Sequence, residues 1–195
     1  MSKPHPITPL SFASHATLSL PGSKSEANRL LIAAALSGHN VTVRGASPSD
    51  DVRYLVAGLA SLGFASAFQD QSQGIVSIGP RHKEAPTSAE LFCGNAGTAL
   101  RFLVSVAATL PGEWVITGDE DMQKRPIQPL VNAWRELGVA IEATNGCPPV
   151  RIHGGTSRGG RVSVDPTVSS QFVSSLLLVG SSMPDGLEIE LCGPL

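Results

Sequence analysis

Cations and hydroxyl side chains gather at the points of this sequence where an apolar helical segment is about to begin. The first is PGSKSEANR at residues 21–29, which holds Lys24, Ser25 and Arg29. A lysine in the first turn of a helix opposes the helix dipole by roughly 0.3–1 kcal/mol unless an anion lies there. Ser25 and Arg29 are four residues apart and share a helix face. Hydroxyls, free backbone N–H groups and two cations predict a phosphate or carboxylate pocket.

An ordinary helix cap is the alternative interpretation of this segment. Ser23 and Glu26 have the spacing of a capping box. A cap explains the serine, but it leaves Lys24 without a role.

Three further clusters have the same character. In GNAGTALR, at 94–101, glycines such as Gly97 let a ligand approach the backbone closely, although Asn95 or Thr98 could equally be a helix cap. In DEDMQKRP, at 119–126, Arg125 stands just before Pro126, which fits a first helical turn. The acids of this cluster are either solvated loop charges or neutralise the cations. The last cluster offers neutral donors suited to hydroxyls and phosphate oxygens: Ser169, Ser170 and Gln171.

The segments that must position these residues resemble one another. Residues 21–45, 93–118 and 166–193 each read as a polar cluster, an apolar helix, a turn, a short strand and a glycine. Such repetition indicates one supersecondary unit used several times. After the first two copies comes an amphipathic helix, at 50–62 and 126–137, with apolar residues at i, i+3, i+4, i+7 and i+10.

The third copy stops before such a helix. We therefore expect a chain cut inside its third unit, or one completed by another chain; a natural domain of two and a half units is the alternative. The glycine-rich segment 154–161 lacks a phosphate-loop pattern and is predicted to be a hairpin turn. Residues 81–89 are predicted to be a loop. The remaining predicted elements are helices at 25–37 and 97–109 and strands at 16–20, 41–45, 64–68, 74–79, 114–117, 139–143, 149–153 and 161–165.

The helix patterns predict an α/β (α+β) fold. The first helix of each copy is apolar nearly all round and should be buried, whereas the second helices are one-sided and should pack under a solvent-facing sheet. We expect repeated βαβαββ units with helices inside and mixed sheets outside, around a pseudo-threefold axis. An extended lead-in at 1–15 precedes one domain at 16–195, with units at about 16–80, 90–153 and 161–195.

Composition narrows the class of protein. With 195 residues, 42% of them hydrophobic and 15% charged, the chain is a globular domain of ordinary size. A net charge of −2 argues against nucleic-acid binding, and no apolar run is long enough for a membrane span. Isolated histidines and three widely spaced cysteines predict no metal site and no disulfide framework. The N-terminus lacks a signal peptide, so we expect a cytoplasmic protein.

Taken jointly, the motifs resemble the 5-enolpyruvylshikimate-3-phosphate (EPSP) synthases. The resemblance covers nearly the whole chain and rests on PGSKSEANR, SDD at 49–51, GNAGTALRFL, KRPIQPLVNAWRELGV and SSQF. Phe102 departs from the proline of many members, and Asp119-Glu120-Asp121 is more acidic than usual.

The resemblance implies a transferase of two domains that close on the substrate, without a metal or organic cofactor. It would move the enolpyruvyl group of phosphoenolpyruvate to the 5-hydroxyl of shikimate 3-phosphate, in the shikimate pathway to chorismate and aromatic amino acids. The reaction passes through a tetrahedral intermediate, which loses phosphate. The herbicide glyphosate would occupy the phosphoenolpyruvate side, beside Gly97.

The resemblance also implies residue roles. Shikimate 3-phosphate would be held by Ser25, Arg29, Ser169, Ser170 and Gln171. Phosphoenolpyruvate would be held by Lys24, Gly97 and Arg125, together with Gln171, in a loop shaped by Asn95 and Thr98. Lys24 would have a further role in proton transfer.

The main acid and base residues would come from a second, catalytic domain that is absent from this sequence. We therefore expect this chain to be inactive alone and the complete enzyme to be a monomer. Two alternatives stay open: a non-catalytic phosphoanion-binding module, and the sibling UDP-N-acetylglucosamine enolpyruvyl transferase.

Overall fold

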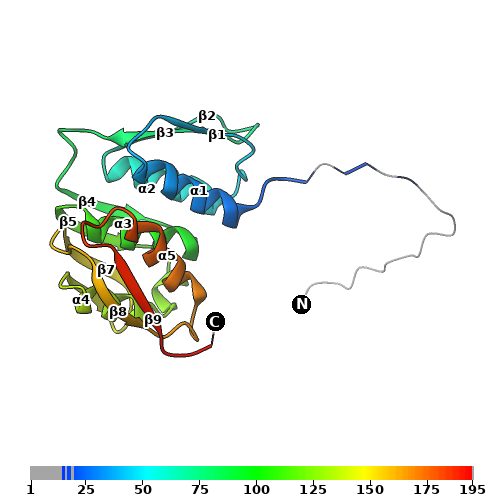
Figure 1. Cartoon of the computed structure of the whole chain (residues 1–195). Coiled ribbons are helices and arrows are strands. Elements are labelled where there is room, and N and C mark those ends of the chain that lie inside the picture. The colour runs from blue at the N-terminus through cyan, green and yellow to red at the C-terminus, as the bar shows by residue number, and fades with distance from the viewer. Residues whose placement is uncertain (1–14, 16, 19, 195) are drawn as a thin grey trace, which may run out of the picture.

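The computed structural model describes residues 15, 17, 18 and 20–194, which form a mixed α/β fold (Figure 1). The elements in chain order are α1 (Lys24–Leu36), β1 (Val41–Val43), α2 (Asp50–Ser61), β2 (Phe64–Asp70), β3 (Ile75–Arg81), β4 (Ser88–Phe92), α3 (Gly97–Thr109), β5 (Gly112–Thr117), the 3-10 turn η1 (Met122–Lys124), α4 (Gln128–Glu136), β6 (Ala140–Thr144), β7 (Cys147–Gly154), β8 (Gly160–Val164), α5 (Ser170–Gly180) and β9 (Leu187–Leu191).

The strands form separate sheets around the helices. The first sheet is antiparallel, in the order β1-β3-β2. The second is mixed, in the order β4-β5-β7-β6, with β4 parallel to β5 and the other pairs antiparallel. The third is the parallel pair β8-β9. On β5, Trp114 and Ile116 alternate with more exposed neighbours, which places one face of this sheet against the core.

Helix α3 lies at the centre of the fold. It contacts α1, α2 and α5, as well as strands β5 and β7. Nearly all of its residues are buried, including Leu100, Phe102 and Leu103, as its apolar sequence predicts. The first helices α1 and α5 are buried on one side only, because Leu30 and Leu177 are exposed. The second helices pack against strands, α2 on β2 and α4 on β6 and β8.

A buried chain of hydrogen bonds ties three helices together. The indole N–H of Trp134 on α4 donates to Ser105 Oγ on α3 at 3.2 Å. Ser105 in turn donates to Ser175 Oγ on α5 at 3.0 Å, and Ser175 donates to the carbonyl of Phe172 at 2.8 Å. Because these groups are shielded from water, the network fixes the helices relative to one another.

The structure corrects several predicted elements. Of the predicted strand at 16–20, the described residues 17, 18 and 20 have no regular structure; residues 16 and 19, like lead-in residues 1–14, lie outside the described part. The predicted loop at 81–89 contains the start of β4, a strand that pairs along its length with β5. Residues 154–161 are not a hairpin turn, because β7 and β8 belong to different sheets. The helix predicted to begin at Pro126 begins two residues later, at Gln128, and the η1 turn precedes it in the chain.

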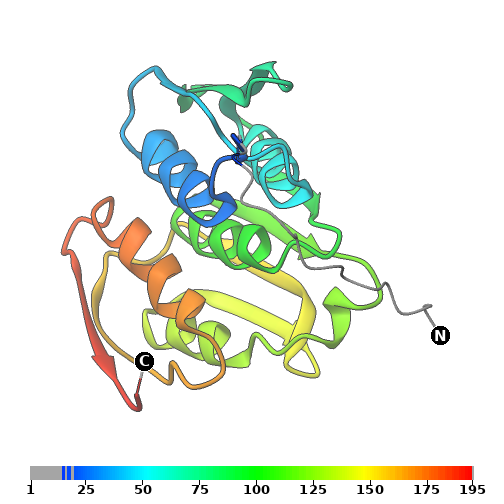
Figure 2. The ribbon, with the colours of Figure 1, turned by 90° about the vertical axis from the view of Figure 1, so that its right-hand side faces the viewer.

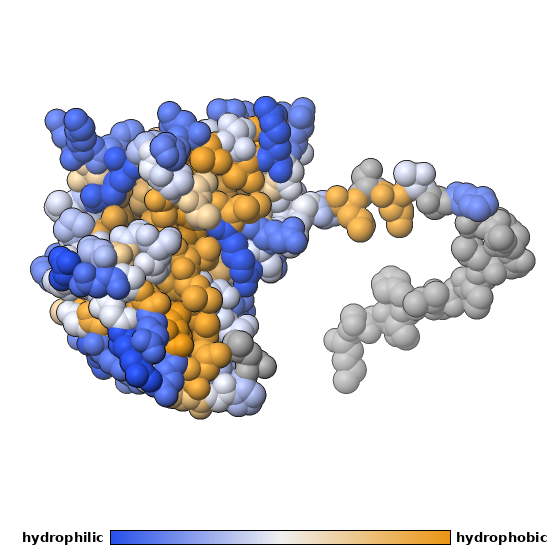
Figure 3. Space-filling view, in the orientation of Figure 1, coloured by the Kyte–Doolittle hydropathy of each residue, from blue (hydrophilic) through white to orange (hydrophobic). Residues whose placement is uncertain are grey.

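One surface of the molecule is rich in apolar side chains (Figure 3). The large exposed apolar residues of the described part include Leu30 on α1, Leu177 on α5 and Leu191 on β9. None of the helices in this part is both long and apolar enough to cross a membrane.

Replacing Ser105 by alanine should destabilise the protein. The change leaves the Trp134 N–H without its acceptor in the core, which costs roughly 1–3 kcal/mol of unfolding free energy. Urea denaturation monitored by tryptophan fluorescence measures this. Ser61→Ala is the control, since its hydroxyl bonds to a carbonyl on an exposed helix end and its loss should change stability by less than about 0.5 kcal/mol. Equal stability of both variants would refute a structural role for the network.

Candidate functional site

The polar clusters of the sequence lie at one side of the fold. Helices α1, α3 and α5 run side by side, with their first turns toward the right in Figure 1. Figure 2 looks onto that side. Free backbone N–H groups at helix starts carry partial positive charge, so this side favours anions before any side chain is considered.

Two guanidinium groups meet beside the first residue of α3. A methyl group added at Gly97 would lie 3.0 Å from Arg125 Nη1 and 3.2 Å from Arg101 Nη1. Burial, and then the charge of Arg125, lower the pKa of Arg101 below its usual value, although it remains a cation at neutral pH. Glycine at this position therefore makes room for two cations of like charge.

Arg101 also bonds to the start of α5. It donates from Nη1 to Gln171 Oε1 at 2.5 Å, and Gln171 Nε2 donates to Thr98 Oγ1 at 2.9 Å. Thr98 and Arg101, near the start of α3, thus hold Gln171 in the first turn of α5. The predicted residues Gly97, Thr98, Gln171 and Arg125 therefore form one connected group.

Two arginines stack on aromatic rings of neighbouring helices. The guanidinium of Arg29 on α1 lies 5.6 Å from the ring centroid of Phe102 on α3, and that of Arg101 lies 5.2 Å from the ring of Phe172 on α5. Both distances are within cation–π range. Arg29 also donates to the carbonyl of Ser25 at 2.9 Å and to Ser174 Oγ at 3.4 Å. Phe102, the departure from the usual proline, thus supports one of the predicted ligand residues.

Lys24 points toward the second helix of its unit. Its Nζ lies 3.5 Å from Asp51 Oδ2. Asp51 also lines a cavity of about 350 Å³ together with Asn95 and Asp119. The rings of Tyr54 and Phe92, which meet edge to face at 5.9 Å, complete its wall. The Asn95 loop therefore lies close to the ion pair of Lys24.

The structure shows which residues cap the helices. Ser23 caps α1 by accepting from the N–H of Glu26 at 3.3 Å, and Ser169 caps α5 by accepting from the N–H of Gln171 at 3.3 Å. On α3 the cap position is Ala96, so neither Asn95 nor Thr98 is its cap.

The acids of the 119–126 cluster serve local structure. Asp119 Oδ1 accepts from the N–H of Met122, and Asp121 pairs with Lys124 at 3.0 Å. Within residues 15, 17, 18 and 20–194, the ion pairs of the structure include neither Arg29, Arg101 nor Arg125.

Two residues were missing from the predicted site. Arg101 is the central link between Gly97 and Gln171, and Asp51 partners Lys24. The repeat offered a signal for the first, because Arg101 precedes Phe102 as Gln171 precedes Phe172. Ser170 lies exposed beside Gln171 at the start of α5, and its hydroxyl takes part in none of the hydrogen bonds among the described residues that join Gln171 to Thr98 and Arg101.

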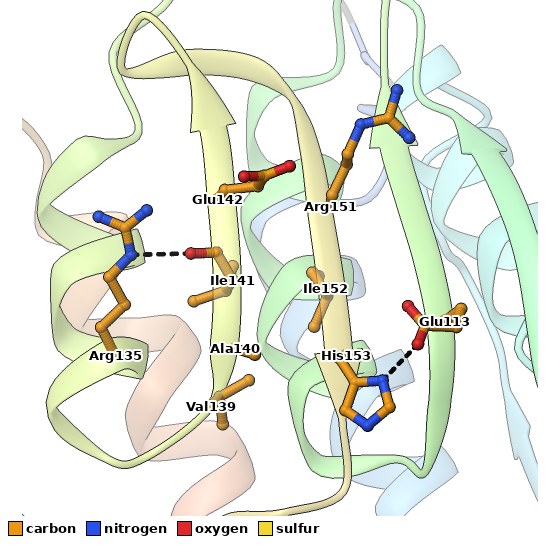
Figure 4. Close-up of a pocket in the computed structure, with 9 residues that line it drawn as sticks. All are labelled: Glu113, Arg135, Val139, Ala140, Ile141, Glu142, Arg151, Ile152 and His153. Carbon is orange, nitrogen blue, oxygen red and sulfur yellow. Dashed lines mark hydrogen bonds and ion pairs between the residues drawn. The ribbon is translucent and has the colours of Figure 1, made fainter.

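A second concave surface lies on the outer face of the β5-β7-β6 sheet (Figure 4). This sheet pocket of about 480 Å³ is lined by residues that include Glu113, Arg135, Glu142, Arg151 and His153. His153 bonds to Glu113, and Arg135 donates to the carbonyl of Ile141 at 2.8 Å. Its charges alternate in sign across the strands, and none of the predicted ligand residues lines it, so the helix starts are the better candidate site.

Cys93 precedes the Asn95 loop but is unsuited to nucleophilic chemistry. It is fully buried, and this burial raises the pKa of its thiol to about 12. The thiolate that would be the nucleophile is therefore scarce at neutral pH. In the described part of the chain, no three metal-ligating side chains gather.

Comparison with known proteins decides the family. The family model of EPSP synthase (3-phosphoshikimate 1-carboxyvinyltransferase) matches residues 12–195. The chain belongs to the EPSP synthase family.

Relatives in this family include the 3-phosphoshikimate 1-carboxyvinyltransferase of Pseudomonas syringae pv. tomato, which is 45% identical over 177 residues, covering 90% of this chain and 42% of that protein. The protein of the same name from Rhizobium etli is 43% identical over 174 residues, covering 89% of this chain and 41% of that protein. The chain thus spans less than half the length of these EPSP synthases.

Solved structures agree with the assignment. The EPSP synthase of Acinetobacter baumannii superposes with a TM-score of 0.75 at 28% identity, over 91% of this chain and 40% of that one. The enolpyruvyl transferase NikO of Streptomyces tendae gives a TM-score of 0.55 at 17% identity, over 89% of this chain and 39% of that one, which shows a shared fold.

Gly97→Ala should weaken anion binding without destabilising the fold. The added methyl group displaces the guanidiniums of Arg101 and Arg125, so affinity for inorganic phosphate should fall about tenfold, the effect of losing one charged hydrogen bond. Alanine is a better helix former than glycine by up to about 1 kcal/mol, so thermal stability should not fall. Gly180→Ala, whose methyl group meets Leu187 instead, is the control for calorimetric titration. Unchanged phosphate affinity in Gly97→Ala would remove this position from the site.

Proposed function

We propose that this chain binds shikimate 3-phosphate and phosphoenolpyruvate for the transfer of an enolpyruvyl group to the 5-hydroxyl of shikimate 3-phosphate. The observation that carries this proposal is the set of guanidiniums of Arg29, Arg101 and Arg125 at one side of the fold, without carboxylate partners in the described part. Both substrates carry several negative charges, which such a set can neutralise.

The proposed division of the site follows the helices. Ser25, Arg29, Ser169 and Ser170 would hold shikimate 3-phosphate, since they belong to the starts of α1 and α5. The Arg29–Phe102 stack and the bond to the Ser25 carbonyl preorganise that guanidinium for a phosphate.

Phosphoenolpyruvate would lie at the start of α3. Gly97 and Arg125 would approach its oxygens there, Lys24 would approach from α1, and Asn95 and Thr98 would shape the loop. Gln171 would contact both substrates, because it reaches from α5 to Thr98.

The residues of this chain can do part of the chemistry. Transfer requires the 5-hydroxyl oxygen to bond to C2 of phosphoenolpyruvate as it loses its proton and C3 gains one. The tetrahedral intermediate then loses phosphate from C2 and a proton from C3. Arginines on both substrates would align the reacting atoms and stabilise charge on the departing phosphate. Lys24, held by Asp51 at 3.5 Å, would bind an anion and take part in proton transfer.

The rest of the reaction is proposed to need a second, catalytic domain. The curated relatives are more than twice as long as this chain. A main acid and base from that domain, closing over the helix starts, would complete a site that is inactive here alone. We propose that the complete enzyme works as a cytoplasmic monomer.

A non-catalytic phosphoanion-binding module is less favoured, since the matched family and the relatives named above are enzymes. The sibling transferase is less favoured, since the matched family and the relatives named above are EPSP synthases. It predicts binding of UDP-N-acetylglucosamine in place of shikimate 3-phosphate.

Calorimetric titration of this chain tests the proposal. Shikimate 3-phosphate should bind saturably and more tightly than inorganic phosphate or shikimate, since only the ester engages both the arginines and the hydroxyl donors. Arg29→Ala should weaken that binding by roughly 1.5–3 kcal/mol, the range for a charged hydrogen bond.

Arg161→Ala is the matched control, because Arg161 pairs with Glu188 and Glu190 on the strands β8 and β9. Equal affinity for shikimate 3-phosphate and plain phosphate would contradict the proposed substrate. Binding of UDP-N-acetylglucosamine instead would support the sibling activity.

A further inference from the structure

The side-chain amide of Gln171 is held at both of its ends. Its Oε1 accepts from Arg101 Nη1 at 2.5 Å, and its Nε2 donates to Thr98 Oγ1 at 2.9 Å. Thr98 is only 7% exposed, so this end of the amide lies against the protein interior.

The chemistry of arginine makes the arrangement directional. A guanidinium can donate hydrogen bonds but cannot accept them, whereas a glutamine amide has one accepting and one donating end. Arg101 must therefore face Oε1, and the amide nitrogen must face Thr98. With one of its two hydrogens on Thr98, Nε2 keeps one more to offer a ligand.

Arg101 is itself fixed before it reaches Gln171. Its guanidinium stacks on the ring of Phe172, 5.2 Å from the centroid, one residue after the glutamine it orients. It stands one helical turn after Gly97 on the central helix α3. Without an acid among the described residues to pair with, it bonds to a neutral amide.

We infer that Arg101 is a positioning residue, which acts through Gln171 by fixing the amide so that its N–H faces the ligand. The edge formed by Thr98 and Gln171 then presents an N–H donor to the ligand and no amide oxygen. Such an edge selects an acceptor-only group, a carboxylate or phosphate oxygen, and disfavours a group that must donate. The identity of the ligand as phosphoenolpyruvate rests on the proposed function.

The first test needs no ligand. In the parent chain, NMR should show nuclear Overhauser contacts between the Gln171 side-chain NH₂ and the Thr98 methyl group. In Arg101→Met the amide is free to turn, and these contacts should weaken or vanish. Arg135→Met is the matched control, since Arg135 likewise donates to an oxygen, the carbonyl of Ile141, but at the sheet pocket. Contacts that persist in Arg101→Met would overturn the proposal.

The second test is a double-mutant cycle read by phosphoenolpyruvate affinity. Arg101→Met should weaken binding about five- to tenfold more in the parent than in a Gln171→Ala background, as expected for loss of one hydrogen bond of about 1–1.4 kcal/mol. The general effect of removing a positive charge appears in both backgrounds and cancels. Equal effects in both would mean that Arg101 acts on the ligand independently of Gln171, and the positioning role would fail.

A variant of Thr98 distinguishes loss of the amide orientation from loss of folding. Thr98→Val removes the acceptor at the other end of the amide but leaves Arg101 on Oε1, so the amide should keep its orientation and the chain should lose little phosphoenolpyruvate affinity. A Thr98→Val chain that binds phosphoenolpyruvate as weakly as Gln171→Ala would mean that Thr98, and not Arg101, orients the amide, which contradicts the proposal even if Arg101→Met proves unstable. If the parent binds no phosphoenolpyruvate, the proposed function is in doubt, whereas the amide orientation is still decided by the NMR contacts.

Discussion

The like charges of Arg101 and Arg125 meet at Gly97, and the rest of the site depends on holding them there. Their nitrogens converge on a residue that has no side chain, at the start of a buried helix whose N–H groups are also positive. Without an anion this arrangement is electrostatically unfavourable: burial, and then the charge of Arg125, lower the pKa of Arg101. The packed core supplies the opposing energy, and an anionic ligand relieves the repulsion.

The fold supplies this constraint through helix α3. It is the element that touches α1, α2 and α5, and the buried Trp134–Ser105–Ser175 chain fixes it against α4 and α5. Because the first helices begin on the same side, each arginine of one helix can stack on an aromatic ring of the next. Arg29 and Arg101 are thereby positioned by neighbouring helices rather than by acids, which would compete with an anionic ligand.

Sequence predicted the parts of the structure that local pattern controls. Helix 97–109 was predicted with its observed bounds, because its apolar run is bounded by Gly97 and a proline-glycine turn. Strand β4 was not, because Ser88 and Glu90 look like a loop and the strand depends on pairing with β5. The hairpin turn predicted at residues 154–161 was also wrong, because the local sequence does not determine which strands pair. At the site, the motifs predicted candidate ligand residues, but the Arg101–Gln171 contact joins residues 70 apart and required the folded chain.

Side-chain NMR of the arginine Nε–Hε groups during titration with phosphoenolpyruvate tests the account most directly. If the helix starts form the anion site, the resonances of Arg125, which would contact the anion, and of Arg101, which holds Gln171 beside it, should shift along one saturable curve. Those of Arg158, which pairs with Asp185 at 2.9 Å, and of Arg135 and Arg151 at the sheet pocket should stay in place. Shifts confined to Arg135 and Arg151, or no arginine shift despite measurable binding, would contradict the claim that the helix starts form the site.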